Sequence, residues 1–139
     1  MEFEDLVKPD TFTASSDADV LRLNVLVLDY VGQTRHATCE ALAKAGLNAS
    51  PVESLEMALD ALRRQEPDAL IISIDTPGLD GHALCEAIHR ANPSRSFSIF
   101  VDTRSPAQDG LEWTETIPDL HVIEDPVTAQ KLAQGMAKA

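Results

Sequence analysis

Apolar residues fall into five short runs along the chain, separated by segments in which they recur every three or four positions. The most apolar run, residues 70–74, shows no alternation of polar and apolar side chains and ends at a cluster of turn residues. Such a run is typical of a strand buried on both faces of a parallel sheet. Four further strands are predicted at residues 23–29, 47–52, 97–101 and 120–123. Because Pro51 interrupts one of them, we expect that strand at an edge of the sheet.

The segments with helical spacing alternate with the predicted strands. They predict helices over residues 34–45, 55–65, 81–91, 105–113 and 127–139. Ser54 is a candidate N-cap, and Gly46 suits a left-handed residue at a helix C-terminus. The helix over 105–113 is poorly specified because it contains Gly110. This alternation predicts an α/β fold, a doubly wound five-stranded parallel sheet with five helices on its two faces.

Composition and charge narrow the classes of partner. The chain has 139 residues, enough for one domain, and a formal net charge of −12. That charge disfavours contact with nucleic acid or an anionic membrane. No apolar stretch approaches the roughly 18 residues of a membrane span, and the N-terminus lacks a signal-peptide pattern. We therefore expect a cytoplasmic protein, with a flexible acidic arm over residues 1–21 and a single domain over 22–139.

Motifs for the common enzymes of this fold class are missing from the sequence. The turn after the first strand has only one glycine, and there is no P-loop, nucleophile elbow or His/Cys metal spacing. Cys39 and Cys85 therefore suggest reduced thiols. The four histidines fall on three predicted elements, and His82 and His89, which share one helix, lie seven residues apart. We expect a protein that is not an enzyme and that has no cofactor.

Four segments carry a resemblance to the receiver domain of bacterial two-component response regulators. They are residues 25–29, 67–68, 76–81 and 125–126. The most specific is Pro-Gly-Leu-Asp-Gly, which follows the central strand, and the resemblance extends over residues 23–139. It implies a flavodoxin-like strand order 2-1-3-4-5. It also implies a site at the carboxyl ends of the strands, where open parallel sheets carry their chemistry.

Receiver domains accept a phosphoryl group from a histidine kinase on an aspartate that ends the third strand. Two acids after the first strand hold Mg²⁺, and a Thr or Ser on the fourth strand and a Lys on the fifth bind the phosphoryl oxygens. These groups provide positioning and charge stabilisation, which phosphoryl transfer requires. The resemblance places the corresponding positions here at Asp29, Tyr30, Ser73, Asp102 (or, with a shift of one residue, Thr103) and Asp125.

Most of that phosphorylation set is replaced in this sequence. Ser73 has no carboxylate to form an acyl phosphate, and we interpret it as a small residue packed at a strand end. Asp125 stands where the Lys should be, Tyr30 replaces the second acid, and Val122 replaces the aromatic switch residue. The resemblance therefore implies a degenerate pseudo-receiver that acts without phosphorylation.

A pseudo-receiver would act by binding a protein partner or by self-association. The fourth helix, fifth strand and fifth helix are the expected contact surface, and Leu111 and Trp113 are its candidate residues. Neither nucleic acid nor a membrane is an expected partner of this domain.

Two other functions stay open. In the first, Asp75 is an unorthodox phospho-acceptor, because it lies two residues beyond Ser73 on the same face of the strand. Mg²⁺ would then be needed, and Asp29 and Asp75 would be its candidate ligands. In the second, the chain is a small nucleotide- or cofactor-binding protein of the flavodoxin-like fold.

The acids of the predicted site need not form a cation site. We expect Asp29, Asp102 and Asp125 to point into solvent or to pair with Arg104, since clustered carboxylates are often structural. If they do converge, at least one of them should have a raised pKa.

Overall fold

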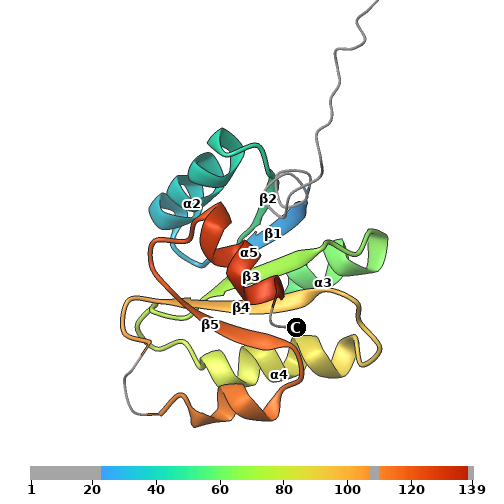
Figure 1. Cartoon of the computed structure of the whole chain (residues 1–139). Coiled ribbons are helices and arrows are strands. Elements are labelled where there is room, and N and C mark those ends of the chain that lie inside the picture. The colour runs from blue at the N-terminus through green and yellow to red at the C-terminus, as the bar shows by residue number, and fades with distance from the viewer. Residues whose placement is uncertain (1–22, 107–109, 138–139) are drawn as a thin grey trace, which may run out of the picture.

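A computed structural model describes residues 23–106 and 110–137. Its centre is a five-stranded parallel sheet with the order β2-β1-β3-β4-β5 (Figure 1). The strands are β1 (Asn24–Leu28), β2 (Asn48–Val52), β3 (Ala69–Ser73), β4 (Ser98–Thr103) and β5 (Leu120–Glu124). The predicted fold class and strand order are confirmed. The predicted acidic arm lies outside the described residues.

Helices cover both faces of the sheet. They are α2 (Gly32–Lys44), α3 (Leu55–Arg64), α4 (Gly81–Ala91), α5 (Ala129–Ala137) and the 3-10 helix η2 (Glu112–Thr116). Buried apolar residues of α2 and α5 share one core cluster, and those of α3 and α4 share another. The doubly wound arrangement therefore places two α-helices on each face.

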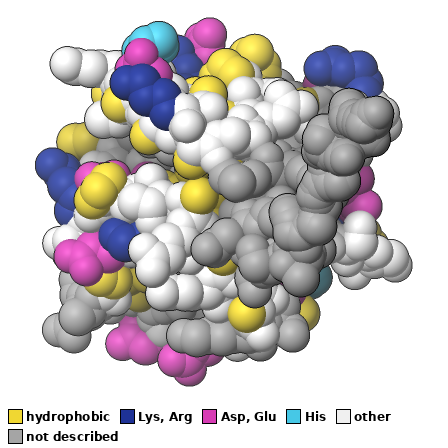
Figure 2. Space-filling view, turned by 45° about the horizontal axis from the view of Figure 1, so that its top comes forward, with side chains coloured by type: hydrophobic (Ala, Val, Ile, Leu, Met, Phe, Trp, Pro, Cys, Tyr) yellow, Lys and Arg dark blue, Asp and Glu magenta, His cyan; other side chains and the backbone are white. Residues whose placement is uncertain are grey.

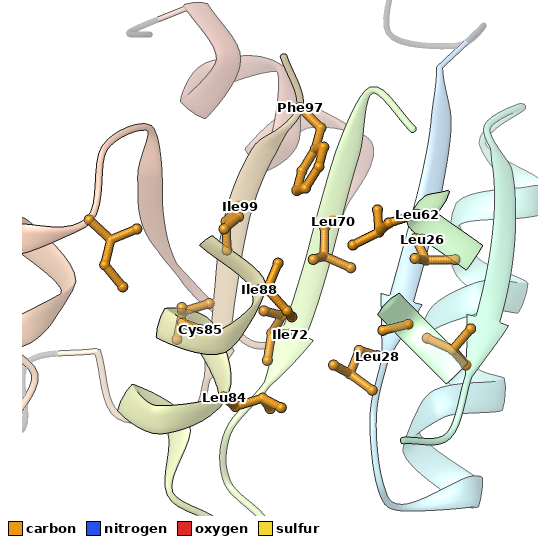
Figure 3. Packing of buried hydrophobic residues seen from close by; sticks show 14 residues of the cluster. Leu26, Leu28, Leu62, Leu70, Ile72, Leu84, Cys85, Ile88, Phe97 and Ile99 are labelled. Atoms are coloured by element: carbon orange, nitrogen blue, oxygen red, sulfur yellow. The ribbon is translucent and has the colours of Figure 1, made fainter. Parts of the chain in front are cut away.

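Alternate residues of the inner strands supply the two core clusters. In β1, Val25 and Val27 face α2 and α5, whereas Leu26 and Leu28 face α3 and α4. Figure 3 shows the second cluster, in which Leu70 and other strand side chains meet those of α3 and α4. Burial on both faces explains why these strands are apolar without alternation.

The segment between β4 and β5 differs from the prediction. A helix was expected over residues 105–113, but the regular part of this segment is η2, Glu112–Thr116. Gly110 has a φ of +94°, a left-handed conformation that an α-helix cannot contain. Among the described residues there are therefore four α-helices and one 3-10 helix, and the prediction of five helices was wrong in this place.

The edge position of β2 was predicted correctly. β2 pairs with β1 on one side, and its other side forms an edge of the sheet. The backbone amide of Asn48 donates to Leu23, and the carbonyl of Val52 accepts from Asp29. Alternate residues therefore face β1, so Ala49 and Pro51 face outward, where the missing N–H of a proline breaks no ladder bond.

The described surface is mixed in character. On the face that Figure 2 shows, and outside the grey residues, hydrophobic side chains form separate small groups among charged ones. No helix in residues 23–106 and 110–137 is long and apolar enough to cross a membrane.

Helix α3 offers a direct test of the capping prediction. The hydroxyl of Ser54 accepts a hydrogen bond of 3.2 Å from the backbone N–H of Met57. Replacing Ser54 with alanine leaves that N–H without its partner and is expected to destabilise the protein by about 1 kcal/mol. Urea unfolding measures the difference, and Ser54→Asp is the matched control, since aspartate caps as well as serine. Equal stability of the alanine variant and the wild type would contradict this role.

Candidate functional site

The pleat of the sheet brings four predicted site residues to one corner of the molecule. Because Val25 and Val27 face α2 and α5, Asp29 comes to the same face two residues later. The same alternation leads from Ile71 to Ser73 in β3, from Phe100 to Asp102 in β4, and from Ile123 to Asp125 after β5. Ser73 and Asp102 are also register partners in neighbouring strands. The strand ends therefore bring three acids and one hydroxyl together.

A pocket of about 260 Å³ lies at this corner. Its lining includes Asp29, Ser73, Asp75, Asp102 and Asp125 from the ends of four strands. Val31, Thr34, Thr76, Pro77 and Arg104 complete it. The expectation that the acids point into solvent was wrong for two of them, since Asp29 and Asp102 are only 2% and 5% exposed. The parallel strands, which end side by side, hold them in place.

Asp102 is the most perturbed group of the pocket. Burial is the main reason why the pKa of its carboxyl rises to about 7 from an ordinary 3.8. The negative charges of Asp125, Asp75 and Asp29 add to this rise in pKa, and the ammonium group of Lys131 opposes it. Oδ1 of Asp102 is buried and has no hydrogen-bond partner among the described residues. Asp102 therefore sits in the pocket with one polar atom unsatisfied by the protein.

Asp75 is held by the two residues that follow Asp102. The hydroxyl of Thr103 donates to one carboxylate oxygen of Asp75 at 2.7 Å. The backbone N–H of Arg104 donates to the other oxygen at 2.9 Å, and its guanidinium Nε lies 3.4 Å from that oxygen. The predicted pairing of Arg104 with Asp29, Asp102 or Asp125 is therefore replaced by a pairing with Asp75.

Asp29 is held in a similar way, whereas Tyr30 leaves the pocket. The carboxylate of Asp29 accepts from the backbone N–H of Val31 at 2.9 Å and from the hydroxyl of Thr34 at 2.5 Å. The Tyr30 hydroxyl instead accepts from the N–H of Leu55, at the start of α3. Tyr30 and Thr103 are therefore predicted site residues that the structure does not place in the pocket lining.

Lys131 is a cation near the pocket that the sequence analysis missed. Its Nζ donates to the backbone carbonyls of Glu124 and Pro126, at 2.8 and 3.0 Å, on either side of Asp125. A Lys on a helix one element beyond the last strand gave no sequence signal for this position. Because Nζ binds carbonyls, Lys131 offsets the negative charge of the pocket without filling the position of the receiver Lys.

The other predicted surface lies beside the start of α4. Leu111 and Trp113 are half-buried and border a shallow hollow with His82, whose ring stacks on Trp113 at 5.1 Å. Trp113 also packs against the core cluster of α3 and α4. Trp113 therefore has a structural role, and its part in partner contact stays a prediction.

The geometry matches solved structures of one fold. The Vibrio cholerae chemotaxis protein CheY4, crystallised at low pH, superposes with a TM-score of 0.69 at 15% identity, over 84% of this chain and 98% of that one. A putative response regulator from Chloroflexus aurantiacus gives 0.68 at 21% identity, over 84% and 96%. This chain has the receiver fold of response regulators.

Sequence comparisons find similarity to parts of longer proteins. The DNA-binding transcriptional regulator NtrC of Escherichia coli is 38% identical over 69 residues, which are 50% of this chain and 15% of that protein. A protein-glutamate methylesterase/protein-glutamine glutaminase of Anaeromyxobacter dehalogenans is 30% identical over 69 residues, or 20% of its length. The chain thus covers a fifth or less of these relatives. No family model matches it.

The magnesium site that the resemblance implies does not fit these residues. Mg²⁺ requires several oxygens in near-octahedral geometry, and both oxygens of Asp29 already accept protein hydrogen bonds. Tyr30, at the second acid position, turns to α3. In residues 23–106 and 110–137, no three or more His, Cys, Asp or Glu side chains are placed to hold one metal ion.

Proposed function

We propose that this chain is a pseudo-receiver, a receiver-fold signalling module that acts by protein contact without being phosphorylated. One observation carries the proposal. Ser73 ends β3 at the acceptor position, and Asp125 follows β5 where a receiver needs a cation. The pocket thus combines a hydroxyl in place of the acceptor carboxylate with a carboxylate in place of the stabilising amine.

Electrostatics supports this proposal. A bound phosphoryl group carries two negative charges, and it would lie among Asp29, Asp102 and Asp125. Lys131 neutralises part of that charge, but its Nζ is bound to backbone carbonyls. Oxygen anions at such short range repel strongly in a partly buried site. The pocket is therefore unsuited to the phosphorylated state that activates a receiver.

The alternative acceptor, Asp75, is disfavoured by its contacts. Both of its carboxylate oxygens accept hydrogen bonds, from Thr103 and from Arg104. Attack on phosphorus would require one oxygen to leave these donors, and the resulting acyl phosphate would lose a charge-assisted bond. These contacts support a structural role for Asp75 in fixing the loop after β4.

Exposure to small phosphodonors tests the proposal. With acetyl phosphate and Mg²⁺, we expect no mass increase by one phosphoryl group, and with beryllofluoride and Mg²⁺ no change in the amide NMR spectrum of the pocket. A receiver with an intact acceptor aspartate is the positive control. If a phosphorylated species does form, the Asp75→Asn variant tests whether Asp75 is the residue that carries the phosphoryl group. Loss of the modification in that variant would establish the alternative, phosphorylated receiver.

The partner contact belongs to the same proposal. The predicted surface consists of the fourth helix, fifth strand and fifth helix, and the 3-10 helix η2 stands among the described residues where that fourth helix was expected. Leu111 and Trp113 remain its candidate residues, and the exposed Val122 of β5 is a further one that the structure adds. We place this role in the cytoplasm, within a regulator or with a separate protein partner.

A further inference from the structure

Two buried polar atoms of pocket-lining residues have no hydrogen-bond partner in the described protein, the hydroxyl oxygen of Thr76 and Oδ1 of Asp102, and only the second belongs to an acid. Asp29 and Asp75 use their carboxylate oxygens in hydrogen bonds to neighbouring residues. Oδ1 of Asp102 has no such bond, although the residue is 95% buried and lines the pocket. An unpaired buried carboxylate oxygen is costly, and a donor that enters the pocket would relieve that cost. The ligand to be identified is therefore a hydrogen-bond donor.

The negative charge of the pocket favours a donor that is also a cation. Asp29, Asp75, Asp102 and Asp125 face the pocket, and the cations nearest to it are already engaged. Lys131 binds backbone carbonyls. Arg104 pairs with Asp75 at the rim, and its side chain is 75% exposed. A carboxylate or phosphate ligand would be repelled, whereas a positive group gains from all four acids.

The spacing of the acids favours an organic cation over a metal ion. In the described part of the chain, no three of the acids converge on a single point at metal-ligand distance. A guanidinium group carries five N–H donors on a flat fork, so it can bond separated oxygens at once, and it loses less hydration than an ammonium group. The pocket of about 260 Å³ is wide enough for such a group, and Val31 and Pro77 offer apolar contacts for a methylene stem.

We propose that this pocket binds the guanidinium group of an arginine on a partner protein, with Asp102 as the deepest carboxylate of the site. The inference rests on the proposed function, because a pocket that accepted phosphate could not also hold this cation. It assigns the degenerate phosphorylation pocket a binding role of its own. The net charge of −12 adds a long-range attraction for a basic partner.

Binding should depend on pH in one direction. The guanidinium prefers the charged form of Asp102, and the pKa of that carboxyl is about 7 before the ligand binds. At pH 6 the ligand has to displace a proton, whereas at pH 8 it does not. The charged groups that face Asp102 are Asp29, Asp75 and Asp125 on neighbouring strand ends and Lys131 on α5. Affinity should therefore rise from pH 6 to pH 8.

The experiment titrates the full chain with N-acetylarginine amide and follows its amide resonances by NMR. We expect shifts at the pocket residues that saturate at millimolar probe, with N-acetylcitrulline amide, the neutral isostere, giving none. Asp102→Asn should weaken binding about tenfold, because a charge-assisted bond is lost. Glu86→Gln, which removes the same charge from a partly exposed position on α4, is the matched control and should bind as the wild type does. Lysine amide acetylated on its α-amine, with its side-chain amine free, tests whether an ammonium group binds the pocket as tightly as a guanidinium group.

Several results would overturn the arginine site. They are equal binding of the citrulline analogue, unchanged affinity in Asp102→Asn, or the same shifts produced by MgCl₂ or CaCl₂ alone. Equal or tighter binding of the lysine probe would assign the pocket to an ammonium group instead. If neither the arginine probe nor beryllofluoride changes the amide NMR spectrum, this inference alone is overturned. If beryllofluoride does change the spectrum, the proposed function is overturned as well.

Discussion

Replacing Asp102 with asparagine is expected to stabilise the folded protein by about 2–4 kcal/mol at pH 8 and by only about 1 kcal/mol at pH 5. The pKa of this carboxyl is about 7 in the folded protein, against an ordinary 3.8. Between these values the folded protein holds a proton that the unfolded chain has lost. The stability of the wild type should therefore fall as the pH rises from about 4 to 7 and stay low above that range. Asparagine carries no charge at either pH, so it removes this cost.

Urea unfolding at the two pH values measures this effect. The Glu86→Gln variant removes one negative charge from a partly exposed position on α4, where Glu86 pairs with Arg90, and it controls for the general repulsion in a chain of net charge −12. Its stability should stay within about 0.5 kcal/mol of the wild type. An equal gain for Asp102→Asn at pH 5 and pH 8 would show that packing, and not the buried charge, is responsible.

Replacing Gly135 with alanine is expected to destabilise the protein by about 2 kcal/mol. Alanine normally favours a helix over glycine by up to about 1 kcal/mol, so the expected sign is opposite to the helix propensity. A Cβ atom at position 135 would overlap Cε2 of Phe100 and lie 3.1 Å from its Cζ. Phe100 is 1% exposed and stacks on His121, so its ring cannot turn away cheaply. Thermal or urea unfolding measures the loss.

A double-mutant cycle separates the clash from other causes. Phe100→Leu replaces the aromatic ring with a smaller aliphatic side chain. Gly135→Ala should therefore cost less stability in that background than in the wild type. Gln134→Ala, at the exposed neighbouring position on α5, is the matched single control and should be nearly neutral. Strictly additive effects of the two core substitutions would contradict the contact between Gly135 and Phe100.

The sequence predicted the fold because its local signals agreed with the tertiary packing. The run at residues 70–74 lies between two layers of helices, so burial on both faces is visible as an unbroken apolar stretch. Asp80 caps α4 and accepts from the N–H of Ala83, so the turn residues before Gly81 placed the start of this helix correctly. Where local signals were weak, around Gly110, the prediction of an α-helix was wrong.

The site could be predicted only in part. The positions of the strand ends and the two-residue alternation of side chains along each strand determine which residues come to the carboxyl edge of the sheet. Asp29, Asp102 and Asp125 line one pocket as a result. The sequence did not predict which side chains contact elements that lie far away in the chain. The hydroxyl of Tyr30 binds the start of α3, and Lys131 reaches back from α5. Neither contact is encoded in a short motif, since each joins elements far apart in the chain.

Among the described strands, β2 has a partner on one side only, and its other margin has a consequence for crowded conditions. An extended peptide that stacked there would find the outward N–H of Ala49 but no donor at Pro51, and the side chains along that margin are mostly small or polar. A fibril has to repeat such contacts from copy to copy, so one missing donor in every layer penalises the whole stack. Concentrated solutions of this acidic protein are therefore expected to resist fibre growth from this margin.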